Sequence, residues 1–182
     1  HDVYLGVLPL FHSFGQTTIL NTGFFRRATI VLQARFEPAE AIALMRREKV
    51  TFFAGVPTMY WALLGHRQAD EQDIAAIAEN LRVAVSGGSA MPLDVLRRVH
   101  DRFGVDIQEG YGLSETSPTA TVNQLEYGVE AGSIGHPIWG VEVGIADSAG
   151  DDAIVLLAPG ATGGVVVPVH NPFRGSPGRP GA

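Results

Sequence analysis

The chain has 182 residues, of which 46% are hydrophobic and 18% charged, and its net charge is −6. This apolar content excludes a chain that is disordered throughout, and the acidic balance argues against nucleic acid as a partner, because phosphate binding needs a basic face. The sequence contains no cysteine, which excludes disulfides, thiolate catalysis and Cys-ligated zinc and favours a reducing, cytoplasmic location. No apolar run approaches the ~18 residues of a membrane span.

Short apolar runs alternate with helical patterns over the first 110 residues. Strands are expected at 3–10, 28–32, 51–54, 82–86 and 106–109, and helices at 16–25, 37–49, 57–64 and 92–103, with a short helical stretch within 66–80. Pro38 and Pro57 stand where helices begin, because the first helical turn leaves its N–H groups unpaired, and Gly104 is a helix stop. This alternation predicts an α/β fold, a mostly parallel sheet with flanking helices.

The helical period disappears after about residue 135. Short strands are expected at 141–145, 154–157 and 164–167 between Gly/Pro turns, and the last dozen residues are expected to be poorly ordered. We therefore divide the chain into an α/β part, 1–140, and a partial β-rich subdomain, 141–182. The chain opens at His1 directly before an apolar run, and a buried strand needs neighbours on both sides. We expect a fragment of a larger N-terminal domain.

Three glycine-containing loops, 11–15, 87–91 and 110–118, each follow a predicted strand. Ligands bind beyond the carboxyl ends of strands in open parallel sheets, so these loops are the candidate site. The 87–91 loop has a strand–turn–helix geometry that suits phosphate, although an ordinary βα turn has the same pattern and no Walker lysine follows. His12, in the first loop, is either a packed side chain or a catalytic one.

The 110–118 loop places Tyr111 between two glycines and continues with Ser114, Glu115 and Thr116. It departs from both G-x-G-x-x-G and the G-x-S-x-G nucleophile elbow at the last glycine, which excludes an α/β hydrolase. The ring could stack on a base, and Glu115 could hold Mg²⁺ against phosphate. Alternatively, Ser114 or Thr116 caps a turn and Glu115 is solvated. On the helices, Met45, Met59 and Trp61 are predicted to lie in the core.

Five segments, taken in order, resemble the adenylate-forming superfamily, which includes acyl-CoA synthetases, adenylation domains and beetle luciferase. They are Leu8-Pro9-Leu10-Phe11-His12-Ser13-Phe14-Gly15, Val56-Pro57-Thr58, Ser86-Gly87-Gly88-Ser89-Ala90-Met91-Pro92, Gly110-Tyr111-Gly112-Leu113-Ser114-Glu115-Thr116 and Gly132-Ser133-Ile134-Gly135. The chain is most similar to bacterial long- or medium-chain fatty-acid–CoA ligases. This resemblance implies an acid–thiol ligase that converts a carboxylate and ATP to acyl-AMP and pyrophosphate, and then acyl-AMP and CoA to a thioester and AMP.

The resemblance also implies roles for individual residues. Tyr111 would stack on adenine, and Glu115 would hold Mg²⁺. Thr116 would contact the phosphate, and His12 and Phe14 would sit at the entrance of the acyl pocket. The nucleotide would be lined by Gly87, Gly88, Ser89, Gly110 and Gly112, with Gly88 also near the acyl group.

Parts of the family's site are not found in this sequence: the upstream phosphate loop, the ribose-binding Asp and the distal catalytic Lys. We therefore expect the fragment to be inactive alone and, because it exposes sheet edge and apolar surface, to self-associate. Two alternatives stay open: an adenylation enzyme for an amino or aryl acid, and a nucleotide-binding module without turnover.

Overall fold

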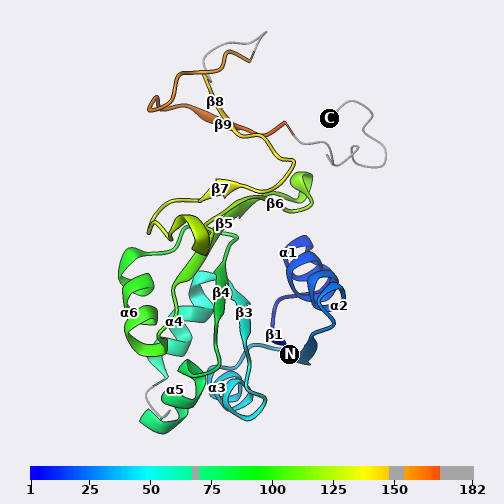
Figure 1. The fold of residues 1–182 in the computed structure, drawn as a ribbon, viewed down its shortest axis with the longest axis vertical. Helices are drawn as coiled ribbons and strands as arrows, with labels where there is room; N and C mark the ends of the chain where they lie inside the picture. Colours follow the sequence, from blue (N-terminus) through cyan, green and yellow to red (C-terminus); the bar gives the residue numbers. More distant parts are fainter. Residues whose placement is uncertain (67–69, 148–153, 169–182) are drawn as a thin grey trace.

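The computed structural model describes residues 1–66, 70–147 and 154–168, and within these ranges seven strands form one sheet in the order β2-β1-β3-β4-β5-β6-β7 (Figure 1). The first five in that order pair in parallel, whereas β6 and β7 are antiparallel to their neighbours. Their bounds are β1 Val3–Gly6, β2 Thr29–Leu32, β3 Phe52–Gly55, β4 Val83–Ser86, β5 Ile107–Gly112, β6 Thr119–Val122 and β7 His136–Pro137. The predicted α/β fold with a mostly parallel sheet is confirmed.

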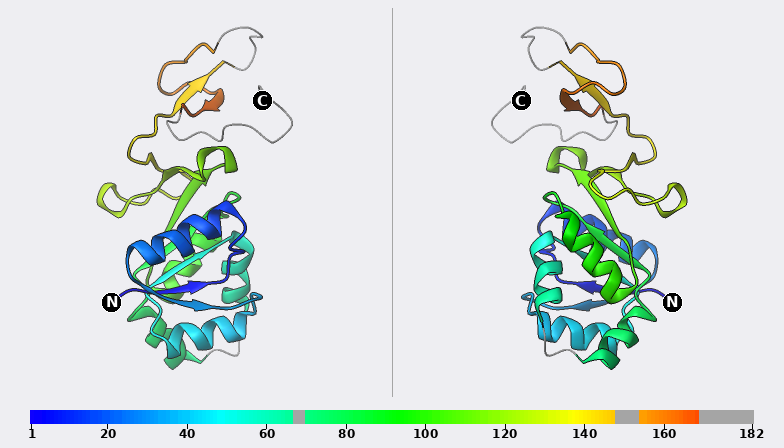
Figure 2. Two further views of the ribbon diagram at one scale, coloured as in Figure 1. Left: turned by 90° about the vertical axis from the view of Figure 1, so that its right-hand side faces the viewer. Right: turned by 90° about the vertical axis from the view of Figure 1, so that its left-hand side faces the viewer.

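The helices divide between the two faces of the sheet (Figure 2). On one face α3 (Pro38–Arg47), α4 (Pro57–Gly65), α5 (Glu71–Ala78) and α6 (Leu93–Phe103) pack against one another over the main core. A continuous helical stretch lies on the other face and comprises α1 (Ser13–Gly15), the π-helix η1 (Gln16–Asn21) and α2 (Thr22–Phe25). A small cluster of Leu8, Ile19 and Ala54 anchors it there.

The local signals for helix ends are confirmed. Pro38 and Pro57 are the first residues of α3 and α4. Gly104 ends α6 in the left-handed conformation, at φ 65°, and donates its N–H to the carbonyl of His100 at 2.8 Å. Glycine adopts this conformation without the steric cost that other residues meet, so the position of the stop follows from the residue type.

Two loop predictions are wrong in detail. The segment Gly110–Gly112 continues β5, because the strand leaves β4 after Glu109 and pairs with β6. Strand β6 was not expected from the sequence. A Cβ on Gly112 would lie 2.0 Å from the carbonyl oxygen of Pro118, so only glycine fits at this crossing. In the first loop, Ser13–Gly15 forms a helical turn rather than a loop.

The core prediction fails at one position. Met45 is buried and Met59 is half-buried, but Trp61 is 62% exposed. Helix α4 is apolar around most of its circumference, so residue type alone does not distinguish its buried face from its outward face.

Beyond the sheet, β8 (Gly144–Ala146) and β9 (Gly164–Val166) form an antiparallel pair, and Leu156 bridges to Ala146. The other residues of the strands expected at 141–145 and 154–157 are not in regular strands. The domain boundary at residue 140 stays a prediction, and the last dozen residues lie outside the described ranges. Over the described residues, no helix is both long enough and apolar enough to cross a bilayer.

Candidate active site

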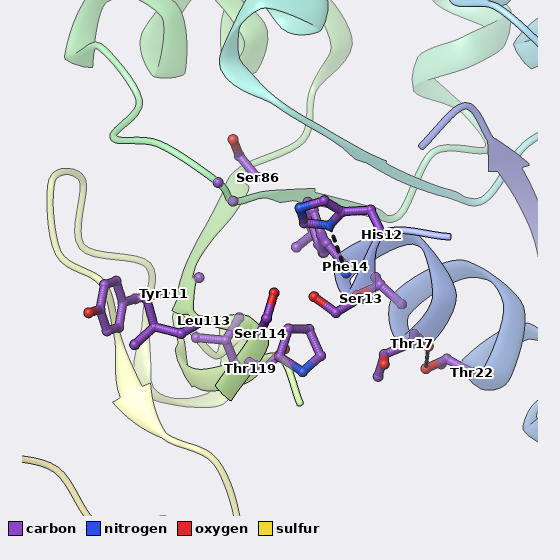
Figure 3. Close-up of a pocket in the computed structure, with 18 of the residues that line it drawn as sticks. His12, Ser13, Phe14, Thr17, Thr22, Ser86, Tyr111, Leu113, Ser114 and Thr119 are labelled. Carbon is purple, nitrogen blue, oxygen red and sulfur yellow. Dashed lines mark hydrogen bonds between the residues drawn. The ribbon is translucent and has the colours of Figure 1, made fainter. Parts of the chain in front are cut away.

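A cavity of about 450 Å³ lies at the carboxyl ends of the parallel strands (Figure 3). It is bounded by the stretch that runs from His12 into α2, by the β4–α6 turn at Gly87 and Gly88, and by the end of β5 with the turn that follows it. These three segments are the ones predicted to form the site, because each follows a strand. The structure brings them together around one space.

Phe14 packs across the glycine turn of the β4–α6 loop. A Cβ built on Gly87 would lie 3.4 Å from Cζ of the Phe14 ring, so the aromatic ring covers the backbone at this point. Gly88 has a φ of 85°, a conformation that other residues rarely adopt, and it exposes its backbone to the cavity. Tyr111 lines the opposite end of the cavity from Thr17 and Thr22 (Figure 3).

His12 has a defined place at the start of the helical stretch. Its Nδ1 accepts a hydrogen bond from the backbone N–H of Phe14 at 3.1 Å, which caps α1. In the neutral ring the proton therefore sits on Nε2, so the other nitrogen is a hydrogen-bond donor. His12 lines the cavity, and its cap also fixes the position of Phe14.

The Ser114–Thr116 turn, η2, separates the two hydroxyls that the sequence left as alternatives. Thr116 is 4% exposed, and its Oγ1 accepts from the N–H of Leu113 at 3.0 Å and lies within hydrogen-bonding distance of the Leu113 and Pro118 carbonyls. This hydroxyl closes the turn and does not line the cavity. Ser114 does line it, and in Figure 3 its side chain extends toward that of Ser13 on the opposite wall.

Glu115 is exposed on the same turn and makes no ion pair or hydrogen bond with the described part of the chain. In the described ranges no group of three or more His, Asp or Glu side chains could hold a metal by itself. A single exposed carboxylate would fit Mg²⁺ if phosphate were bound beside it, because Mg²⁺ is commonly held by one or two carboxylates together with phosphate oxygens and water.

A buried carboxylate, not considered in the sequence analysis, supports the site from behind. Glu109 is 9% exposed, and its two oxygens accept from the N–H groups of Met91 at 3.0 Å and Gly132 at 3.2 Å. Asn123, 1% exposed, donates to the carbonyl of Ser133 at 2.6 Å. These hydrogen bonds hold the 132–135 segment against the end of β5 and the β4–α6 loop. The Gly132-Ser133-Ile134-Gly135 motif does not line the cavity, and its role is to support the segments that do.

The cavity gathers most, but not all, of the predicted site residues. Those that line it are His12, Phe14, Gly87, Gly88, Gly110, Tyr111 and Gly112, whereas Ser89, Glu115 and Thr116 lie outside its lining. The cavity is also lined by residues to which the sequence assigned no role of their own: Ser13, Thr17, Thr18, Thr22, Phe52, Val85, Ser86, Leu113, Pro118, Thr119 and Val122. The sequence signal for part of this lining was the presence of three threonines within six residues of a predicted helix.

The AMP-binding enzyme family matches residues 1–175, and the chain belongs to this family. It is 34% identical over 133 residues to a long-chain-fatty-acid–CoA ligase of Bacillus subtilis, and the matched region covers 73% of this chain and 23% of that relative. It is 31% identical over 175 residues to a feruloyl-CoA synthase of an Amycolatopsis species, and the matched region covers 96% of this chain and 34% of that relative. The chain thus spans about a third or less of the length of these curated relatives.

Solved structures of the family share the fold. ATP-bound MatB from Rhodopseudomonas palustris is 27% identical with a TM-score of 0.83, covering 96% of this chain and 33% of that one. An O-succinylbenzoate CoA synthetase, MenE, from Bacillus subtilis in complex with ATP and magnesium ion is 25% identical with a TM-score of 0.76, covering 96% and 34%.

Proposed function

We propose that this chain forms part of the adenylation site of an ATP-dependent acyl-CoA ligase. The observation that carries the proposal is the meeting of three segments of family-like sequence around one cavity at the carboxyl ends of the parallel strands. The named activities of its relatives, long-chain-fatty-acid–CoA ligase and feruloyl-CoA synthase, support the same reaction with different acids.

The reaction proceeds in two displacements. A carboxylate oxygen attacks the α-phosphorus of ATP, the bond from that phosphorus to the bridging oxygen breaks, and pyrophosphate leaves. The CoA sulfur then attacks the acyl carbon, and AMP leaves as the thiol proton is released. Neither step needs a protein nucleophile, so the side chains act by positioning the reactants and by stabilising charge.

The residues divide between the two ends of the cavity. At one end, Tyr111 stacks on the adenine, and the backbone of Gly87 and Gly88 forms the wall between this end and Phe14. Ser114, whose hydroxyl is not used to close the turn, donates to a phosphate oxygen. Thr116 holds that turn in place. At the other end, His12 and Phe14 lie beside the acyl group, and the neutral imidazole can donate its Nε2–H to a carboxylate oxygen.

Glu115 is the residue that would hold Mg²⁺, which supplies positive charge to the phosphates. Ser89 lies outside the cavity lining, and no direct contact with the nucleotide is assigned to it. The sequence motifs favour a fatty acid as the substrate, and an aryl acid is the alternative.

The test is binding of ATP to the chain, measured by equilibrium dialysis with labelled nucleotide and Mg²⁺. Tyr111→Ala should weaken binding by about 1–3 kcal/mol, the usual worth of stacking a base on an aromatic ring. Tyr127→Ala is the matched control, because Tyr127 is 62% exposed and lies outside the cavity lining. Equal ATP affinity of the wild-type and Tyr111→Ala proteins, with circular dichroism unchanged, would show that the nucleotide does not bind here.

A further inference from the structure

The acyl end of the cavity, defined by Ser13, Phe14, Thr17, Thr22 and Phe52, combines two aromatic rings with three hydroxyls. Thr17 and Thr22 are five residues apart and would not share a face of a regular α-helix. The wider turn of the π-helix η1 brings them onto one face, where the Thr22 hydroxyl donates to the carbonyl of Thr17 at 2.8 Å. The two threonines therefore line the same cavity as the Phe14 and Phe52 rings.

Two of these hydroxyls have no partner of their own. The Oγ of Ser13 is buried and makes no hydrogen bond with the described residues. The Thr17 hydroxyl likewise makes none within the described ranges. Leaving the buried hydroxyl of Ser13 unpaired is costly, so a group that hydrogen-bonds to it gains more here than on an exposed surface. Thr17 is half-buried, and its hydroxyl is available to a ligand in the cavity.

The inner wall behind Phe52 is closed. The ring of Tyr4 stacks on that of Phe52 with centroids 4.2 Å apart, and Tyr4 is 5% exposed. Ile19 fills the space between η1 and the sheet and is fully buried. A long alkyl chain therefore has no tunnel in this direction, and the 450 Å³ of the cavity also extends to the nucleotide end at Tyr111.

From this wall we infer that the site takes a compact carboxylic acid with an aromatic ring that bears an oxygen substituent, in preference to an unbranched fatty acid. The inference rests on the proposed function. The substrate ring lies between Phe14 and Phe52, where offset or edge contacts between rings are favourable. Its oxygen meets the hydroxyls of Ser13 and Thr17, which can each donate and accept.

The experiment compares three stable analogues of acyl-AMP, 5′-O-sulfamoyladenosines that carry nine-carbon acyl groups. The groups are 3-(4-hydroxyphenyl)propanoyl, 3-phenylpropanoyl and nonanoyl, so the nucleotide part and the carbon count are constant. We expect the hydroxylated ring to bind the chain about 3- to 10-fold more tightly than the plain ring, which is the range of one hydrogen bond. The plain ring should bind more tightly than nonanoyl.

Two variants test the hydroxyls separately. Thr17→Val and Ser13→Ala should each reduce the preference for the hydroxylated ring over the plain ring, measured as the ratio of the two dissociation constants. Thr58→Val is the matched control, because Thr58 is exposed on α4 and does not line this cavity. Using two variants keeps the test informative if one of them fails to fold.

The outcomes separate the inference from the proposed function. Equal binding of all three analogues, tightest binding of nonanoyl, or an undiminished hydroxyl preference in both folded variants would overturn the inference and leave the proposed function standing. Binding of none of the three would overturn the proposed function itself, and the inference with it.

Discussion

Thr116 and Ser114 lie two positions apart on one turn, yet their hydroxyls have different environments. Thr116 is buried among the backbone groups of Leu113 and Pro118, whereas Ser114 lines the cavity. The resemblance implies a phosphate contact for Thr116, but a hydroxyl already shared among backbone groups has little left to offer a ligand. The sequence Ser-Glu-Thr alone does not show which hydroxyl closes the turn and which one faces the cavity.

Two substitutions should therefore have opposite effects. Thr116→Val should lower the free energy of unfolding by about 1–2 kcal/mol, because the buried turn loses the hydroxyl that bonds to the backbone groups of Leu113 and Pro118. The N–H of Leu113 keeps one acceptor, the carbonyl of Pro118 at 2.9 Å. Ser114→Ala should leave stability within about 0.5 kcal/mol and weaken ATP binding. Urea unfolding and dialysis against labelled ATP check the two results. A Ser114→Ala protein that loses stability but keeps full ATP affinity would contradict this division.

Glu115 should affect the use of Mg²⁺ rather than folding, because its carboxylate is exposed and has no partner within the described chain. Glu115→Gln should raise the Mg²⁺ concentration that half-maximal ATP binding requires, since a charged oxygen ligand is lost. Glu126→Gln is the matched control: Glu126 is also exposed at the middle of a short 3₁₀ turn, η3 (Leu125–Tyr127). An unchanged Mg²⁺ dependence in Glu115→Gln would remove the proposed metal role.

At the scale of elements, helix α4 is tied to the sheet by one buried phenol. Tyr60 is 2% exposed, and its hydroxyl lies 2.8 Å from the carbonyl of Val85 and 3.3 Å from that of Phe53. Its ring also packs edge-on against Phe53, with centroids 5.1 Å apart. This contact fixes the start of α4 against β3 and β4, whose ends carry the site.

Burial raises the pKa of the Tyr60 phenol well above its usual range. The unfolded chain releases this proton near pH 10 while the folded chain keeps it, so the contribution of Tyr60 to stability is complete below about pH 10 and falls above it. Tyr60→Phe should cost about 1 kcal/mol at pH 7. It should also flatten the fall in stability between pH 10 and 11, as measured by urea unfolding; an equal fall in both proteins would contradict the assignment.

The sequence predicts the elements whose signals are local. The proline starts of α3 and α4, the Gly104 stop and the alternation of strand and helix all come from residue type and spacing. It does not predict β6 or the extension of β5 through Tyr111, because these two segments become strands only by pairing with each other, where Gly112 lies against the backbone of Pro118. The exposed face of Trp61 and the π-turn in η1 likewise depend on packing against other parts of the chain.

The residues of the site were likewise predictable only where their signals are local. The glycine loops and Tyr111 could be predicted, because a glycine that follows a strand lets a ligand approach the backbone closely. The buried oxygens of Glu109 and the threonine stripe on η1 could not, because their roles depend on which backbone N–H groups and rings the fold brings beside them.

At the scale of the whole molecule, the sheet has an exposed side next to β2. Leu32 on this strand is 62% exposed, and Phe24 and Phe25 at the end of the neighbouring helix are 69% and 86% exposed. A strand edge with unpaired backbone groups and apolar neighbours favours association between copies. This is the physical basis for expecting the 182-residue protein to self-associate, a prediction that sedimentation at several concentrations would check.

Turnover by these 182 residues alone is limited by the charge of the nucleotide. ATP brings several negative charges, yet the described residues that line the cavity include no lysine or arginine, and Glu115 adds a negative charge nearby. Removing one charge-stabilising donor typically costs ~10²–10³ in rate, and here the cavity offers hydroxyls and backbone N–H groups without any cation from the protein. We therefore expect no sustained AMP formation when the purified chain is incubated with ATP, Mg²⁺, CoA and either a fatty acid or an aryl acid. Controls without the acid set the background of ATP hydrolysis. AMP formation above that background, proportional to protein and dependent on an acid, would show that this chain neutralises the phosphates by itself.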